Sequence, residues 1–141
     1  MDNLMEIKFL SKSENESFAR TVIAAFTAPL DPTLEEMADV KTAVSEAVTN
    51  SIVHGYSSSA GYVFMNCSVD SRVLTVTVKD NGKGIEDVKK AVEPLYTSKP
   101  ELERSGMGFT VMETFMDSMK VESVEGKGTK VILSKKFNSV R

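Results

Sequence analysis

Residues 72–84 read RVLTVTVKDNGKG, a β-rich run that ends in an acid and two glycines. Its apolar residues alternate with polar ones at a period of two, which predicts a strand ending at Asp80. Residues 61–69 have the same character, and the short polar segment Asp70-Ser71 separates the two runs. We therefore predict an antiparallel hairpin whose second strand leaves a carboxylate at its end.

Two amphipathic helices are predicted before the hairpin. The first spans residues 14–28, where apolar side chains recur on one face until a proline stops the helix. The second starts at Thr33, which forms a capping box with Glu36, and ends near His54-Gly55. Its apolar stripe comprises Leu34, Met37, Val40, Val44, Ala47, Val48 and Ile52.

Shorter elements complete the chain. Residues 5–10 suit an edge strand, 85–92 and 108–117 favour short helices, and 119–125 and 129–137 favour strands. The resulting order, βααββααββ, lacks the regular βαβ alternation of a parallel sheet. We therefore predict a single α+β domain over the whole chain, a two-layer sandwich with helices on one face of a mixed, mostly antiparallel sheet.

Composition narrows the classes of function. The 141 residues suffice for one domain with a real core, and the net charge of −3 argues against direct nucleic-acid binding. The single cysteine, Cys67, can build neither a disulfide framework nor a thiolate metal site, which suggests a reducing compartment. No apolar run reaches the roughly 18 residues of a membrane span, and the N-terminus lacks the pattern of a secretory signal. We therefore expect a cytoplasmic protein without a membrane contact.

The long helix carries acidic and amide side chains opposite its apolar stripe. A rotation of about 100° per residue brings Asp39, Glu46 and Asn50 toward the same side. A carboxylate and an amide four residues apart could serve phosphates and a metal ion. The same pattern also occurs on an ordinary solvated helix face, so this motif alone leaves both interpretations open.

The end of the predicted strand offers a second group of residues. The Asp80 carboxylate could accept a hydrogen bond from an exocyclic amine such as that of adenine, and Gly82 and Gly84 would let a flat ring approach the backbone. Asn-Gly is also common in simple turns. Taken alone, the motif is compatible with either role.

A third group combines two glycines with nearby cations. Gly106 and Gly108 precede a helix and follow the irregular stretch 93–107, which contains Lys99 and Arg104. Free amides at a helix N-terminus bind phosphates, and cations strengthen that field. Arg104 is the better candidate for offsetting phosphate charge, although both cations could simply be solvated. The spacing matches neither a P-loop nor the dinucleotide-binding fingerprint.

In this order, these motifs resemble the ATP-binding fold shared by gyrase, the Hsp90 chaperone, histidine kinases and MutL. The stretches that carry this resemblance are 46–50, 80–84, 106–108 and 126–129. Within that superfamily the chain is similar to the anti-sigma-F factors of endospore-forming bacteria. The segments that carry this closer similarity are 14–20, 30–33, 45–56 and 101–109, and it extends from about Met5 to Phe137.

The resemblance implies a dimeric serine kinase that uses ATP and Mg²⁺, inhibits a sporulation sigma factor and phosphorylates a serine of an anti-anti-sigma protein. Carried over by position, it makes Asn50 the Mg²⁺ ligand, Glu46 the base near the seryl hydroxyl, and Asp80 the residue that recognises adenine. The base pocket would be completed by Gly82, Gly84 and Thr129, and the phosphate lid would be shaped by Gly106 and Gly108.

An alternative from another class is a nucleotide-dependent module that binds the sigma factor without catalysis. Glu46 favours the enzyme, because a pure binder needs no carboxylate beside the γ-phosphate. His54 is better explained as a helix end than as a phospho-acceptor, which disfavours a complete histidine kinase. Glu16 and Arg20 lie off the apolar face of the first helix and could contact a partner or be ordinary exposed charge.

Overall fold

The computed structural model describes residues 1–57, 59–92 and 108–138. The strands are β1 (Asn3–Leu10), β2 (Tyr62–Asp70), β3 (Val73–Asp80), β4 (Ser118–Val124) and β5 (Gly128–Lys136). The helices are α1 (Glu14–Thr27), α2 (Leu34–Thr49), α3 (Val88–Val92) and α5 (Phe109–Phe115), with a 3₁₀ turn η1 (Ala28–Leu30) and a π-helical turn η2 (Asn50–Gly55). None of the helices in these described ranges is long and apolar enough to span a membrane.

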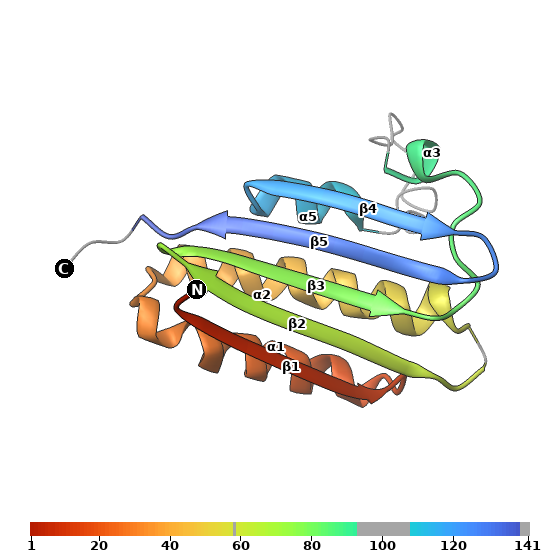
Figure 1. Cartoon of the computed structure of the whole chain (residues 1–141), viewed down its shortest axis with the longest axis horizontal. Coiled ribbons are helices and arrows are strands. Elements are labelled where there is room, and N and C mark those ends of the chain that lie inside the picture. The colour runs from red at the N-terminus through yellow and green to blue at the C-terminus, as the bar shows by residue number, and fades with distance from the viewer. Residues whose placement is uncertain (58, 93–107, 139–141) are drawn as a thin grey trace.

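The predicted two-layer α+β sandwich is confirmed. The strands form one sheet in the order β1-β2-β3-β5-β4, and α1, α2 and α5 cover one of its faces (Figure 1). Each of the four strand pairings is antiparallel, so the sheet of the described residues contains none of the parallel pairing that a mixed sheet would have. The predicted elements differ from the observed ones mainly at their ends.

The predicted hairpin of β2 and β3 is confirmed, but its turn lies one residue later than predicted, because Asp70 still pairs with Val73. Ser71 and Arg72 make the two-residue turn with φ angles of 51° and 67°, a left-handed geometry that matches the twist of the flanking strands. At the opposite end of the hairpin, Asp80 pairs with Val63 on β2 and with Thr129 on β5. The hairpin therefore places Asp80 at the end of the central strand, between β2 and β5.

Alternate side chains of the strands point into the layer between the sheet and the helices. The apolar residues of β3 at positions 74, 76 and 78 are fully buried, and Asp80 continues the same alternation with only 2% of its surface exposed. The strand thus directs a carboxylate toward the helix layer. Cys67 lies in the same layer, where burial raises the pKa of its thiol to about 12, so it packs as a neutral side chain.

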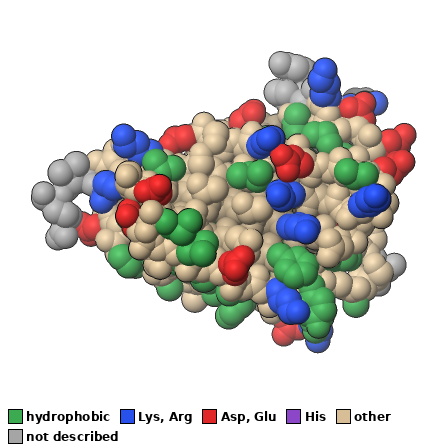
Figure 2. Space-filling view, in the orientation of Figure 1, with side chains coloured by type: hydrophobic (Ala, Val, Ile, Leu, Met, Phe, Trp, Pro, Cys, Tyr) green, Lys and Arg blue, Asp and Glu red, His purple; other side chains and the backbone are tan. Residues whose placement is uncertain are grey.

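The opposite face of the sheet is left open by the described helices. Figure 2 shows that basic side chains gather over the right-hand half of this face. One cross-strand row reads Lys8, Phe64, Lys79, Lys130 and Glu122. Glu122 lies 3.9 Å from the Lys130 ammonium and 3.0 Å from that of Lys120, so part of this charge is balanced locally.

The start of α2 matches its prediction, and the helical run also ends where predicted, at Gly55, although its last turn is not α-helical. The Thr33 hydroxyl accepts a hydrogen bond from the Glu36 amide, and the Glu36 carboxylate accepts one from the Thr33 amide, which completes the capping box. Leu34, which the sequence placed in the apolar stripe, is instead 92% exposed. After Thr49 the helix widens into the π turn η2, a form that often occurs at functional sites.

Candidate functional site

A cavity lies where the end of α2 meets the loop after β3 and the start of α5. Its described lining combines polar groups from η2 and β3 with apolar walls from α5 and β5. The lining residues are Asn50, Ser51, His54, Gly55, Asp80, Gly84, Ile85, Phe109, Thr129 and Val131. A few convergent polar groups on apolar walls are the kind of lining that ligand pockets have.

Asp80 is the buried charge in this cavity. Its Oδ1 atom accepts a hydrogen bond from the Gly82 amide at 2.9 Å, and the Ser51 hydroxyl and the Thr129 amide also donate to the carboxylate. Burial raises the pKa of Asp80, and these three hydrogen bonds oppose that shift. A carboxylate can accept about four hydrogen bonds. The three protein donors therefore leave capacity for a donor from a ligand such as an exocyclic amine.

Close backbone packing holds the loop that follows Asp80. A Cβ atom on Gly82 would lie 2.1 Å from the Gly55 carbonyl oxygen, and the Lys83 amide donates to that oxygen at 2.8 Å. The loop is thereby fastened to the end of η2. Gly82 supports the Asp80 carboxylate through its amide and is absent from the described cavity lining, whereas Gly84 lines the cavity directly.

Glu46 lies beside the start of α5. A Cβ atom on Gly108 would lie 2.2 Å from the Glu46 Oε2 atom, so a side chain at this position would displace the carboxylate. Burial raises the pKa of Glu46, and the negative charge of Glu16 raises it further. The Ser45 hydroxyl donates to Glu16 and holds that second carboxylate against α2.

The side chains around the cavity offer few oxygen atoms to a metal ion, which suits an ion held mainly by a bound ligand. The described part of the chain contains no cluster of three or more His, Cys, Asp or Glu residues able to hold a metal ion. Mg²⁺ in nucleotide sites usually takes few protein oxygens and completes its shell with phosphates and water. The amide oxygen of Asn50, on the cavity wall one turn beyond Glu46, fits that role.

Residues 9–135 match the family model of the histidine kinase-like ATPase domain. Over 139 residues the chain is 64% identical to an anti-sigma F factor of Clostridium kluyveri, which covers 99% of this chain and 98% of the relative. The chain belongs to the anti-sigma F factor family. An anti-sigma F factor of Clostridium acetobutylicum is also 64% identical, over 97% of this chain and 96% of its own length.

Solved structures agree with this fold. The RsbU and RsbW domains of a Mycobacterium tuberculosis protein align with a TM-score of 0.70 at 16% identity, over 96% of this chain and 32% of theirs. The catalytic domain of the histidine kinase ThkA aligns with a TM-score of 0.56 at 12% identity, over 94% of this chain and 96% of its own. At these identities the likeness concerns the fold alone.

The resemblance to anti-sigma F factors predicted a set of site residues, and the structure brings together most of those that it describes. Asn50, Asp80, Gly84 and Thr129 line one cavity, and Gly108 lies against Glu46. The predicted positions Lys99, Arg104 and Gly106 lie outside the described residues.

Asp39 shares the polar side of α2 with Glu46, but its environment differs. Its carboxylate lies 3.8 Å from the Lys135 ammonium, and it is absent from the described lining of the cavity. Asp39 therefore lies on the predicted side of α2 but apart from the cavity. Two turns of helix, roughly 10 Å, separate Asp39 from Glu46.

Four lining residues of this anti-sigma F family member were not singled out from the sequence, and one of them is Val131 on β5. Ser51 donates to Asp80 and is buried, Phe109 forms an apolar wall, and Ile85 follows Gly84. The position of Ser51 directly after Asn50 was the available signal. His54 also lines the cavity, and burial together with the nearby Lys83 charge lowers its pKa, which favours the neutral imidazole.

Proposed function

We propose that this chain acts as a single ATP-binding kinase domain that inhibits a sporulation sigma factor and phosphorylates a serine of an anti-anti-sigma protein. One observation carries the nucleotide part of the proposal. The buried Asp80 carboxylate faces a cavity lined by Asn50, next to Glu46 at the start of α5. Membership in the anti-sigma F factor family supports the sigma-factor part.

At the base end of the cavity, Asp80 orients adenine by accepting a hydrogen bond from its exocyclic amine. The Ser51 hydroxyl and the Gly82 amide keep the carboxylate oriented before the nucleotide arrives. Gly84 and Thr129 border the ring, and Phe109 excludes water from it. The polar contact selects the base, and the apolar wall strengthens that contact by lowering the local dielectric.

At the phosphate end, the amide oxygen of Asn50 would hold Mg²⁺. When bound, the ion offsets negative charge on the phosphate oxygens. Glu46 accepts the proton of the seryl hydroxyl, and its raised pKa makes it a stronger base than an ordinary glutamate. We assign Gly106 and Gly108 to shaping the phosphate lid and Arg104 to balancing phosphate charge; Gly106 and Arg104 lie outside the described residues.

The regulatory part of the proposal is a competition between two protein partners. The nucleotide-bound protein, a homodimer in the cytoplasm, holds the sigma factor. The anti-anti-sigma protein approaches the same region and presents its serine to the γ-phosphate. Phosphorylation releases this competitor and restores inhibition of the sigma factor, so the transfer reaction resets the switch.

A binding module without kinase activity is the second candidate. It shares the adenine site and the sigma factor, but it needs no base near the phosphates. The placement of Glu46 against Gly108, with a raised pKa, favours the kinase, because a partly buried carboxylate beside a phosphate site carries an electrostatic cost that pure binding does not require.

The deciding experiment follows ³²P from γ-labelled ATP to the serine of a cognate anti-anti-sigma protein, with and without Mg²⁺. We expect labelling that depends on Mg²⁺, and a Glu46→Gln variant that binds ATP normally but transfers phosphate about 10²- to 10⁴-fold more slowly. Glu35→Gln, an exposed change on the same helix, serves as the matched control and should transfer normally. Absence of labelling from protein that binds ATP would support the binding module instead.

A further inference from the structure

The short helix α5 supplies two parts of the proposed site from its first turn. Phe109 forms a wall of the cavity, and Gly108, the residue before the helix, lies against the Glu46 carboxylate. The helix spans only Phe109–Phe115, about 10 Å. Because the backbone hydrogen bonds of so short a helix connect its two ends, a contact that holds the far end also influences where Phe109 and Gly108 lie.

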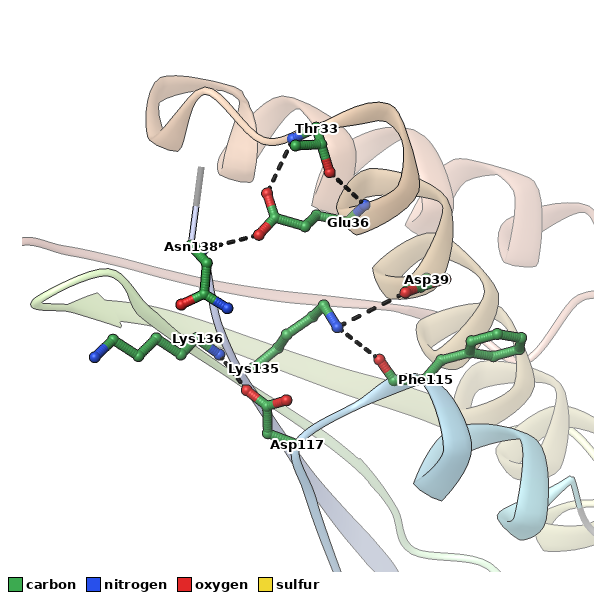
Figure 3. A network of polar contacts seen from close by, with 8 residues as sticks. All are labelled: Thr33, Glu36, Asp39, Phe115, Asp117, Lys135, Lys136 and Asn138. Atoms are coloured by element: carbon green, nitrogen blue, oxygen red, sulfur yellow. Dashed lines mark hydrogen bonds and ion pairs between the residues drawn. The ribbon is translucent and has the colours of Figure 1, made fainter. Parts of the chain in front are cut away.

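The far end of α5 is held by a lysine from the sheet. Lys135 of β5 pairs with the buried Leu74 of β3, so its side chain points into the helix layer, where only 13% of it is exposed. Its ammonium donates a hydrogen bond to the Phe115 carbonyl at 2.9 Å and lies 3.8 Å from the Asp39 carboxylate (Figure 3). One cation thus joins α2, α5 and β5.

These contacts differ in kind from the packing that otherwise attaches α5 to α2. The buried apolar residues of α5 and of its C-terminal end include Met112 and Met116, whose flexible side chains adapt to small displacements. Apolar packing is also non-directional. A hydrogen bond from an ammonium to one of the unpaired carbonyls at a helix end has a defined geometry and is strong in a partly buried setting.

Neighbouring polar contacts fasten the strand that carries Lys135. The Asp117 carboxylate accepts a hydrogen bond from the Lys136 amide at 2.6 Å, and the Glu36 carboxylate accepts one from the Asn138 amide at 2.8 Å (Figure 3). Glu36 is also part of the capping box of α2. The end of β5 is therefore a rigid base from which the Lys135 side chain reaches α5.

We propose that Lys135 and Asp39 are positioning residues for the nucleotide site. By tying the Phe115 carbonyl to α2, they determine how far α5 lies along α2, and so where Phe109 and Gly108 lie relative to Asp80 and Glu46. Asp39 balances the ammonium and keeps it directed at the carbonyl. This inference rests on the proposed function for its effect on ATP, but its effect on α5 itself is independent of any ligand.

The test compares Lys135→Met, which keeps the apolar stem and removes the charge, with Lys135→Arg, which keeps a cationic donor. Lys135→Met should weaken ATP binding about 3- to 30-fold and also lower the transfer rate at saturating ATP, and Lys135→Arg should recover most of both. Asp39→Asn should also weaken ATP binding, but less than Lys135→Met does. In the double variant the two losses should not add, because both changes remove the same contact. The matched control is Lys136→Met, the neighbouring exposed lysine on the other face of β5, which should bind ATP normally.

Amide hydrogen exchange of the ligand-free variants separates this inference from the proposed function. We expect Lys135→Met to speed exchange in residues 108–115 while leaving the β2–β3 hairpin protected. Unchanged exchange in α5, or an equal increase throughout the protein, would overturn the positioning role. Faster exchange confined to α5, in a protein whose parent form binds no ATP, would support the positioning role and reject the proposed function.

Discussion

The two ends of α2 carry similar polar side chains in different settings. At the first end, the Thr33 and Glu36 side chains cap the helix and Asp39 faces the Lys135 ammonium. At the other end, Glu46 lies beside Gly108 and within the field of Glu16. A carboxylate on a polar helix face is therefore structural or functional according to the partner that the fold brings to it.

The carboxyl groups at the end of α2 near the cavity, its site end, have raised pKa values. Burial raises the pKa of both Glu46 and Asp80. A raised carboxyl pKa means that the folded protein holds the proton more tightly than the unfolded chain does. The stability from such a group is present at low pH and decreases as pH rises from the ordinary carboxyl value through the raised one. The site end of α2 therefore carries an electrostatic cost near neutral pH that a cation or a hydrogen-bond donor can reduce.

The largest effect that would sharpen this comparison is expected at Asp80. Asp80→Asn should weaken ATP binding by about 1.5 to 3 kcal/mol, because a hydrogen bond to a charged acceptor is lost. Titration with a fluorescent ATP analogue measures this change. Asp70→Asn, an exposed change at the other end of β2, is the control. Equal affinities in Asp80→Asn and the parent protein would reject the adenine assignment.

Alanine variants of two glycines with positive φ can distinguish the effect of backbone strain from that of crowding at Glu46. Gly108 and Gly126 have φ angles of 69° and 81°, so alanine at either position should cost about 1 to 2 kcal/mol of unfolding free energy. A Cβ on Gly108 would meet Glu46, whereas a Cβ on Gly126 has no atom within 4 Å. Chemical denaturation should therefore show similar losses, but only Gly108→Ala should slow phosphate transfer. Equal transfer rates would mean that the Gly108 contact with Glu46 is incidental.

The Thr33 cap of α2 should affect stability alone. Thr33→Ala removes the side-chain partner of the Glu36 amide and should lower the free energy of unfolding by about 1 kcal/mol. Thr42→Ala, an exposed change within the same helix, is the control for the loss of a threonine. ATP affinity of Thr33→Ala, measured by the same titration, should equal that of the parent. A clear loss of affinity would show that the two ends of the helix are coupled through the cap.

The smallest expected effect concerns the pH dependence of transfer. Because the negative charge of Glu16 helps to raise the pKa of Glu46, Glu16→Gln should lower that pKa. Glu46 would then stay ionised to lower pH, and the acid limb of the transfer rate should move to lower pH. Glu14→Gln, an exposed change on α1, should leave the profile in place. A shift toward higher pH would contradict the role of Glu46 as the base.

Local signals in the sequence were sufficient for much of the fold. The capping box at Thr33 depends on residues three apart, and the hairpin depends on two alternating runs and a two-residue turn. The same alternation places Asp80 at the end of a strand and on the side of its buried neighbours. These features were predictable because each is determined by contacts between residues that are close in the chain.

The sequence by itself determined the strands, the two long helices and the residue types available to the site. The tertiary structure alone decided which of them meet: Asp39 with Lys135, Glu46 with Gly108, and Ser51 with Asp80. It also decided the π turn after Thr49 and the exposure of Leu34. The physical reason is that burial, pKa and hydrogen-bond partners depend on how distant segments pack, and helical or strand periodicity gives the direction of a side chain but not the group that it faces.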